Sequence, residues 1–189
     1  MSPDPLAWWQ SQFSGIAPRG HILRNALSER WVRFHSLPDS KRYAESEDEY
    51  LEIQSRHFAV ASALFSADEP LYVFRAHAAE NRLRGKARHQ LAGRQFREAV
   101  AVLPTASQTE DEGRMYVRAL VSKWKPDFFE AAIRLLANWQ EVGISFASPS
   151  TKNIFCPYDG GMDVFAFSVA PEELRVRFAG WRSARPDGM

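Results

Sequence analysis

The chain has 189 residues, 45% of them hydrophobic and 13% aromatic, which is enough apolar material for a compact core and too much for intrinsic disorder. Its 24 Lys and Arg residues almost balance 23 Asp and Glu residues, so the net charge is +1 and no global basic field exists to attract nucleic acid or an anionic membrane. We expect a single α+β domain over residues 1–189.

Cys156 is the only cysteine, which excludes an intrachain disulfide. The N-terminus carries Asp4 and two adjacent tryptophans where a signal peptide would have a basic segment followed by an apolar run. No apolar stretch reaches the roughly 18 residues that a membrane span needs. We therefore expect a cytoplasmic protein with no membrane partner.

The predicted elements of the N-terminal half follow from spacing and end signals. Residues 1–20 are expected to form a short amphipathic helix over 5–13 and a linker, and a further helical turn follows over 21–27. Bulky and β-branched side chains predict a strand over 31–37. A capping box at residues 46–49, followed by apolar residues at steps of three and four, predicts a helix that ends near Ser66. Residues 71–76 predict a buried strand.

The middle of the chain gives weaker signals. Residues 78–95 are polar and basic and have no clean period, so a basic loop and a helix both stay open. A strand is expected over 96–103, and a solvated loop is expected over 105–113.

The C-terminal half is easier to interpret. Alternation over 115–122 predicts a half-buried strand, and Pro126 opens a helix that Gly143 is expected to end. Short strands are expected over 144–147, 153–156 and 162–167, with a tight turn at 158–161 because Asp-Gly and Gly-Gly tolerate positive φ. A last helix starts at Pro171. The sequence therefore predicts a mainly antiparallel sheet covered by helices, with a C-terminal β-hairpin followed by a terminal helix.

The first candidate site follows the strand predicted over 31–37. Lys41 and Arg42 are suited to clamping an anion, and His35 is suited to moving a proton near neutral pH. The alternative is a structured turn, in which Ser36 satisfies loose backbone groups and Tyr43 packs against the neighbouring helix.

The second candidate is the predicted hairpin turn. Tyr158 and Asp159 lie in the turn and Asp163 lies on the strand after it. The two aspartates resemble a metal pair, but a cation site needs several oxygen ligands and no matching ligand run is present. The Gly pair lacks a phosphate-loop pattern. We expect no metal and no cofactor here, and a hairpin turn explains the two glycines.

The third candidate is a basic cluster that could contact the phosphates of a nucleic acid. Acidic residues flank it and no nucleic-acid fold signature accompanies it, so a solvated face or a contact for an acidic protein partner is the alternative. Its members are Arg82, Arg84, Lys86, Arg88, Arg94 and Arg97.

Two other residues with chemical potential are expected to be structural. Cys156 lies at a strand end beside a proline, where a buried, inert thiol is the common case. His57 falls on the apolar face of the predicted helix over 46–66, which indicates a core histidine. Hydrolase, zinc, kinase, Rossmann and P-loop signatures are missing from the sequence.

Residues 31–43 read W-V-R-F-H-S-L-P-D-S-K-R-Y, and residues 155–164 read F-C-P-Y-D-G-G-M-D-V. They resemble the two signature stretches of a family of small uncharacterised bacterial proteins, approximately W-x-R-x-H-S-L-P-x-S-K-R-Y and H-P-Y-D-G-G-A-D-V. Cys156 stands where that pattern usually has histidine, which argues against catalysis through this position. The second stretch is also distantly similar to the Y-D-D-R-G hairpin of a bacterial group that includes immunity-like members.

We expect a non-catalytic protein-interaction module of bacterial origin, immunity- or defence-associated, because Trp, Tyr and Arg anchor protein interfaces. Its expected partner is another protein. A small enzyme is one alternative, and it requires the two signature segments to share a pocket. Its site would join His35, Lys41, Arg42 and Tyr158 to Asp159 or Asp163. The second alternative is nucleic-acid binding through residues 82–97.

Overall fold

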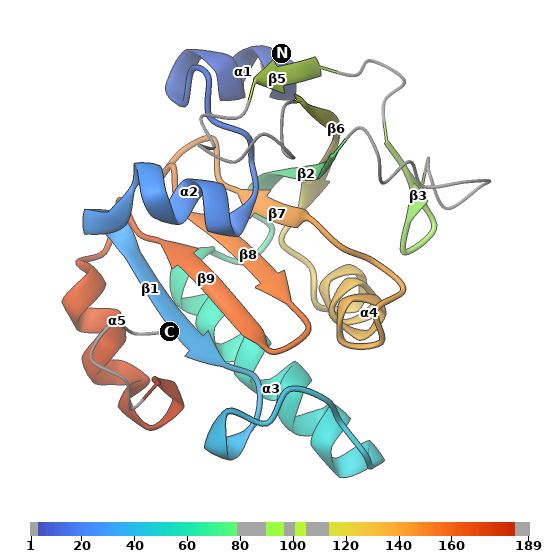
Figure 1. Cartoon of the computed structure of the whole chain (residues 1–189), viewed down its shortest axis with the longest axis vertical. Coiled ribbons are helices and arrows are strands. Elements are labelled where there is room, and N and C mark those ends of the chain that lie inside the picture. The colour runs from blue at the N-terminus through green and yellow to red at the C-terminus, as the bar shows by residue number, and fades with distance from the viewer. Residues whose placement is uncertain (1–3, 79–89, 97–100, 105–113, 184–189) are drawn as a thin grey trace.

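The computed structural model describes residues 4–78, 90–96, 101–104 and 114–183, and it confirms the predicted α+β class (Figure 1). Its main sheet has seven strands in the order β1-β9-β8-β7-β2-β6-β5, and neighbouring strands run antiparallel. The strands are β1 (Trp31–His35), β2 (Pro70–Ala78), β5 (Ala101–Pro104), β6 (Arg114–Lys123), β7 (Ile144–Ala147), β8 (Ile154–Tyr158) and β9 (Gly161–Phe165). A separate small hairpin joins β3 (Gln90–Leu91) to β4 (Arg94–Gln95).

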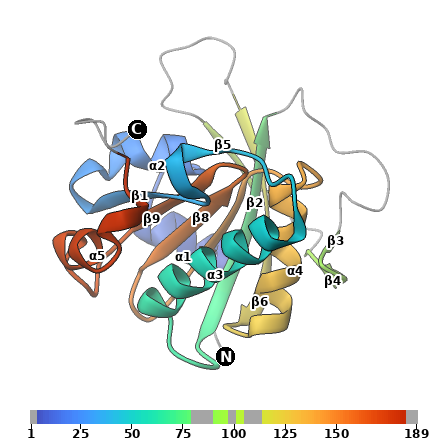
Figure 2. The same cartoon turned by 90° about the horizontal axis from the view of Figure 1, so that it is seen from below.

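Helices cover both faces of the main sheet (Figure 2). One face packs against α1 (Pro5–Gln12) and α2 (Gly20–Ala26), and the other packs against α3 (Glu47–Leu64), α4 (Pro126–Ala137) and α5 (Pro171–Arg177). Side chains alternate between two apolar cores because strand residues point to opposite faces in turn. Phe74 and Val117 belong to the α1–α2 core, whereas Val73 and Leu120 belong to the core under α3 and α4.

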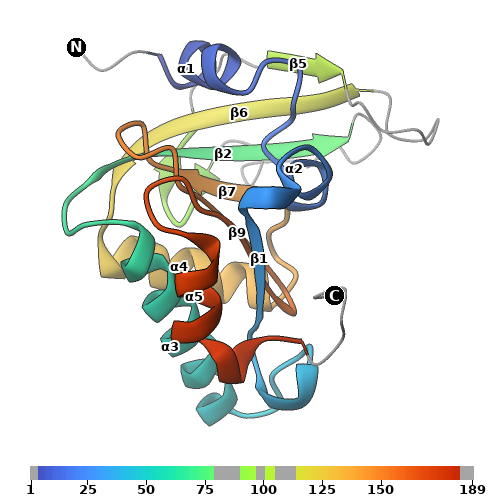
Figure 3. The same cartoon turned by 90° about the vertical axis from the view of Figure 1, so that its left-hand side faces the viewer.

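The sheet twists strongly, so that β2 and β6 run across the direction of β1 and β9 (Figure 3). The two signature segments lie side by side at the β1 end of this sheet. β1 pairs with β9, and His35 stands opposite Gly161. The predicted C-terminal hairpin of β8 and β9 is confirmed, and α5 follows it.

The strand predicted over 115–122 is not half-buried. Val117 and Ala119 lie under the α1 side, while Arg118 and Ser122 on the opposite side are 4% and 5% exposed. The alternation of apolar and polar residues therefore reflects two covered faces of different polarity. Period-2 spacing separates the faces of a strand but does not say which face meets water.

The end of α4 also differs from the prediction. The helix stops at Ala137, Asn138 is its C-cap, and Trp139 adopts a left-handed conformation with φ 57°. Gly143 has another role, because its carbonyl accepts from the Ala76 N–H at 2.9 Å. A Cβ at position 143 would lie 2.1 Å from the Ala76 carbonyl oxygen, so only glycine fits against β2.

The capping of α3 agrees in part with the capping box. The Ser46 hydroxyl accepts from the Glu49 N–H at 3.3 Å, as predicted. The Glu49 carboxylate accepts from the N–H of Glu45, at 2.6 Å, and so reaches one residue further back than Ser46. The helix ends at Leu64, two residues before the predicted end.

The predictions for the middle segment are tested only in part. Residues 79–89, 97–100 and 105–113 lie outside the described residues, and so does the predicted loop over 105–113. Within 90–95 the chain forms the β3–β4 hairpin and not a helix. The strand predicted over 96–103 is seen as β5 at Ala101–Pro104, and Phe96 lies outside any strand. Across the described ranges, no helix has the length and apolarity to cross a bilayer.

Candidate functional site

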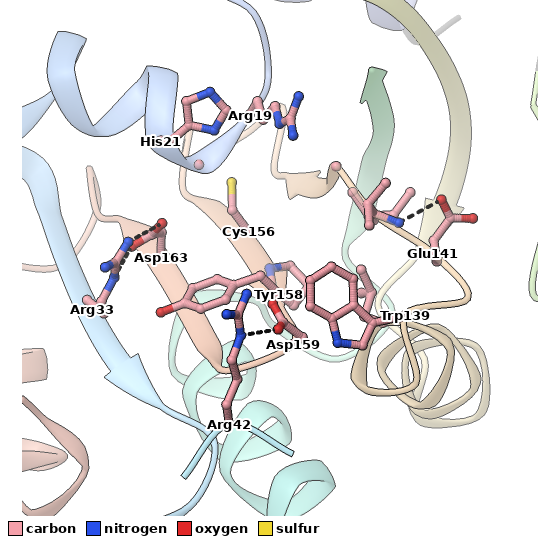
Figure 4. A pocket seen from close by; sticks show the side chains of 16 residues that line it. Arg19, His21, Arg33, Arg42, Trp139, Glu141, Cys156, Tyr158, Asp159 and Asp163 are labelled. Carbon is pink, nitrogen blue, oxygen red and sulfur yellow. Dashed lines mark hydrogen bonds and ion pairs between the residues drawn. The ribbon is translucent and has the colours of Figure 1, made fainter. Parts of the chain in front are cut away.

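A cavity of about 340 Å³ opens on the α2 side of the sheet, where β8 and β9 meet the start of α2 and the loop after α4 (Figure 4). We call it the Tyr158 cavity, after the ring that crosses it. Apolar side chains of Leu136, Ile144 and Pro157 form part of the wall. The polar and aromatic lining includes Arg19, His21, Arg33, Arg42, Trp139, Glu141, Asp159 and Asp163. Its size is at the lower end of the range for ligand sites.

Arg33 and Asp163 form a buried ion pair on one side of this cavity. The Arg33 Nε and Nη2 donate to the two Asp163 carboxylate oxygens at 2.9 and 3.2 Å, and the Trp31 indole N–H donates to the same carboxylate at 2.7 Å. The Arg33 guanidinium also lies over the rings of Trp31 and Tyr158. We call Trp31, Arg33 and Asp163 the closed group. It explains why an aspartate occupies the buried face of β9.

Arg42 and Asp159 form the corresponding pair on the other side. The Arg42 Nε donates to the Asp159 carboxylate. The guanidinium lies over the exposed rings of Tyr43 and Trp139, at 5.5 and 5.2 Å from their centres, and the two rings are 6.1 Å apart. We call these four residues the open group. The predicted packing of Tyr43 on a helix is replaced by this contact at the end of α4.

Tyr158 and Cys156 stay protonated between the two groups. Burial raises the pKa of the Tyr158 phenol, and it raises the pKa of the Cys156 thiol well above its ordinary value, with the Asp163 charge adding to the effect. The Cys156 sulfur points into the cavity in Figure 4. This agrees with the predicted inert thiol, because a thiol kept neutral is a poor nucleophile.

Four residues predicted for the first candidate site end up in different places. Arg42 lines the cavity and the Tyr43 ring packs beside Arg42 and Trp139 of that lining, but His35 and Lys41 are not part of the lining. The Lys41 ammonium donates to Glu45 and Glu49 at 2.9 and 2.7 Å.

His35 and the fifth predicted residue, Ser36, lie where the end of β1 meets the β8–β9 hairpin. The His35 Nε2 is buried without a hydrogen-bond partner among the residues described. Burial and the charges of Arg33 and Arg56 lower the pKa of His35. The Ser36 N–H donates to the Gly160 carbonyl at 3.1 Å, which continues the β1–β9 contact. The structure thus brings Arg42, Tyr158, Asp159 and Asp163 together, and it leaves His35, Ser36 and Lys41 outside the cavity.

The two hairpin glycines were predicted to allow a turn with positive φ, and the structure gives another explanation for them. Neither has positive φ. A Cβ at Gly161 would lie 2.3 Å from the Phe34 carbonyl oxygen and 2.8 Å from the Tyr158 hydroxyl, whereas one at Gly160 would lie 3.2 Å from the flexible Arg42 side chain and 3.5 Å from the Tyr158 ring, which is an ordinary contact. Close approach of β1 and of the Tyr158 ring therefore requires glycine at 161.

The remaining predicted residues are structural or untested. His57 is a core residue as predicted, with Nδ1 2.8 Å from the Ile53 carbonyl and Nε2 3.2 Å from the Gly161 carbonyl. Arg94 donates to Ser122 at 3.0 Å. The other members of the basic cluster, Arg82, Arg84, Lys86, Arg88 and Arg97, lie outside the described residues. In the part of the chain that is described, no group of three or more His, Cys, Asp or Glu side chains is arranged to hold a metal.

Several residues of the cavity were not predicted as site residues. Arg33 had a usable signal, because an arginine between apolar neighbours in a predicted strand needs a buried partner. Trp139 falls within the helix that was predicted to run from Pro126 to Gly143, so no site was expected there. Arg19, His21 and Glu141 gave no signal, since only the fold brings the start of α2 and the loop after α4 to the end of β8.

Residues 19–186 match the model of the family described as Domain of unknown function (DUF3885). The chain belongs to the DUF3885 family. This match includes both signature segments and the whole lining of the Tyr158 cavity. No curated protein and no solved structure matches the chain.

Proposed function

We propose that this DUF3885 protein is a non-catalytic protein-binding module and that the open group is its anchor. The observation that carries the proposal is an exposed cluster of Trp, Tyr and Arg side chains at the mouth of a cavity. Trp139 and Tyr43 are 55% and 44% exposed, and the Arg42 guanidinium lies against both rings. These three residue types dominate binding hot spots, and hot spots centre on pockets.

The conformation of Trp139 supports this proposal. The position after a helix C-cap is commonly glycine, because the left-handed conformation is unfavourable for other residues. Here a tryptophan with φ 57° occupies it and leaves more than half of its surface exposed. A bulky residue in a strained position with little burial is typical of a side chain kept for binding.

The protonation states of the side chains in the cavity favour binding over catalysis. The Cys156 thiol and the Tyr158 phenol are both held neutral, and Asp163 is fixed by the closed group. Such groups recognise a ligand but do not supply a nucleophile or a base at neutral pH. The enzyme alternative also needs His35 and Lys41, which do not line the cavity.

The setting that we propose is the bacterial cytoplasm. A single buried cysteine suits a reducing compartment. The distant similarity to immunity-like hairpin proteins favours a toxin or another defence protein as the partner.

The test compares the wild-type protein with Trp139→Gly and Arg42→Gln variants. Each immobilised protein is incubated with a lysate of the source organism, bound proteins are quantified by mass spectrometry, and the enriched partner is purified for calorimetry. We expect both substitutions to weaken binding by about thirty-fold, as for hot-spot residues.

The matched control is Leu51→Ala, because Leu51 is also 55% exposed but lies on α3, away from the cavity. This variant should bind the partner as the wild type does. A purified partner whose Kd is the same for the wild type and both open-group variants would refute the proposal, as would the absence of any saturable partner.

A further inference from the structure

The polar atoms of the Tyr158 cavity that still lack a partner are hydrogen-bond donors. The Arg42 Nε is engaged with Asp159, but its two Nη atoms donate to no residue that the structure describes. The same holds for the Trp139 indole N–H and the Tyr158 hydroxyl, which is held neutral by burial. A ligand that satisfies these groups must bring acceptors.

The acidic side chains around the cavity are already occupied. Asp163 accepts three hydrogen bonds within the closed group. Asp159 accepts from Arg42. Glu141 accepts from Arg75 and from the Val142 N–H. The three carboxylates are 12% exposed or less, so they present little negative charge to an incoming ligand.

Positive charge, in contrast, converges on the cavity from three elements. Arg19 at the start of α2, Arg33 on β1 and Arg42 in the loop after β1 all line it. Arg24, on α2, lies close enough for its charge to act on the Tyr158 phenol. The three arginines of the lining equal its three carboxylates in number, but the carboxylates are buried in ion pairs while the Arg42 side chain is 55% exposed, so the accessible positive charge favours an anionic ligand.

We infer that the Tyr158 cavity binds a carboxylate side chain of the protein partner. This inference rests on the proposed function and names the chemistry of the partner's contact. The free edge of the Arg42 guanidinium matches the two oxygens of a carboxylate, and the Trp139 ring, which carries an N–H donor, lies with its centre 5.2 Å from the guanidinium. The methylene groups of a glutamate then lie against Leu136, Ile144 and Pro157.

The probe is N-acetylglutamate methylamide, and N-acetylglutamine methylamide is its neutral isostere. Each is titrated into the full-length protein while the indole N–H signals of the six tryptophans are followed by NMR. The Trp139 signal is assigned by its loss in a Trp139→Phe variant. We expect saturable shifts of this signal with the glutamate probe, and affinity about ten-fold weaker with the glutamine probe or in Arg42→Gln.

Arg177→Gln is the matched control, since Arg177 is an exposed arginine on α5 that lies over Phe178. It should leave the affinity for the glutamate probe unchanged. Equal affinity for the two probes would overturn the inference, and so would tighter binding of inorganic phosphate than of the glutamate probe.

The two proposals fail separately. If Trp139→Gly abolishes partner binding while the glutamate probe does not bind, the protein-binding function stands and the carboxylate assignment is wrong. If the glutamate probe binds but the open-group variants keep the partner at wild-type affinity, the cavity binds carboxylates and the proposed docking surface is wrong.

Discussion

Two Arg–Asp pairs lie on either side of Tyr158, and they differ mainly in their access to water. The side chains of Arg33 and Asp163 are 13% and 4% exposed, whereas those of Arg42 and Asp159 are 55% and 12% exposed. Aromatic rings accompany both pairs. The closed group, however, directs its polar atoms at other residues of the fold, and the open group leaves donors at the mouth of the cavity.

This difference separates a structural use of the same residue types from a binding use. The closed group links the neighbouring strands β1 and β9 at a buried position. An unpaired charge there would be costly because water is excluded. The open group joins a loop to the end of α4, and water screens its ion pair, so that pair contributes little to stability. Four tests, each a measurement of the free energy of unfolding, examine this distinction.

The largest effect is expected from Asp163→Ala. It leaves the Arg33 guanidinium and the Trp31 N–H without their acceptor in a buried site, and we expect a loss of about 4 kcal/mol. The matched change, Asp159→Ala, removes the exposed pair and should cost about 1 kcal/mol or less. Urea denaturation measures both. Equal losses would show that the two groups are energetically alike.

The next effect is a pH dependence from His57, which contacts the Gly161 carbonyl beside the closed group. Burial lowers the pKa of His57 from 6.5 to about 4. Between these values the unfolded chain binds a proton that the folded protein does not, so stability falls as the pH drops from 6.5 to 4, by up to about 3 kcal/mol. Denaturation across this range measures the slope.

The His57→Gln variant should be less stable than the wild type but should lack this part of the slope. A His21→Gln variant should keep it, because His21 is partly exposed at the start of α2. An unchanged slope in His57→Gln would assign the pH dependence to other groups.

A smaller effect separates the two hairpin glycines. Gly161→Ala forces a Cβ against the Phe34 carbonyl and the Tyr158 hydroxyl on the closed side, and we expect a loss of about 2 kcal/mol. Gly160→Ala meets the Arg42 side chain, which can move, and makes an ordinary contact with the Tyr158 ring, so its loss should stay below about 1 kcal/mol. Thermal unfolding of the two variants ranks them, and the reverse order would contradict the close-approach explanation.

The smallest effect, with the opposite sign, is expected from Trp139→Gly. Glycine adopts the left-handed conformation without steric strain, while the lost ring contacts with Tyr43 and Arg42 are exposed. We expect stability to be unchanged or to rise by up to about 1 kcal/mol, measured by urea denaturation. A loss of more than about 2 kcal/mol would mean that Trp139 serves the fold, which would remove the main support for the open group as an anchor.

Much of the fold was predictable because its signals are local. β7 matches its predicted bounds, and the predicted helices at residues 5–13, 21–27 and 171 onward match α1, α2 and α5 closely. The predictions that failed concern residues whose role depends on contacts with elements distant in sequence. The extent of α4 was wrong because Gly143 fits against Ala76 on β2, a contact that no spacing along the chain reveals.

The candidate site was predictable only in part, because local signals identify its residues but not their arrangement in space. Arg42, Tyr158, Asp159 and Asp163 were chosen from the two signature segments, and all four line one cavity. His35 was also chosen, but it is not among the residues that line the cavity.

The sequence by itself determined the alternation of apolar side chains, the positions of the main helices and the presence of two unusual segments, because each depends on residues that are close along the chain. Only the tertiary structure decided that β1 pairs with β9, that Asp163 is neutralised by Arg33, and that Arg42 stays available beside Trp139. The reason is physical. Whether an arginine serves the fold or a ligand depends on which acceptors surround it and on its exposure to water, and both are set by elements distant in sequence.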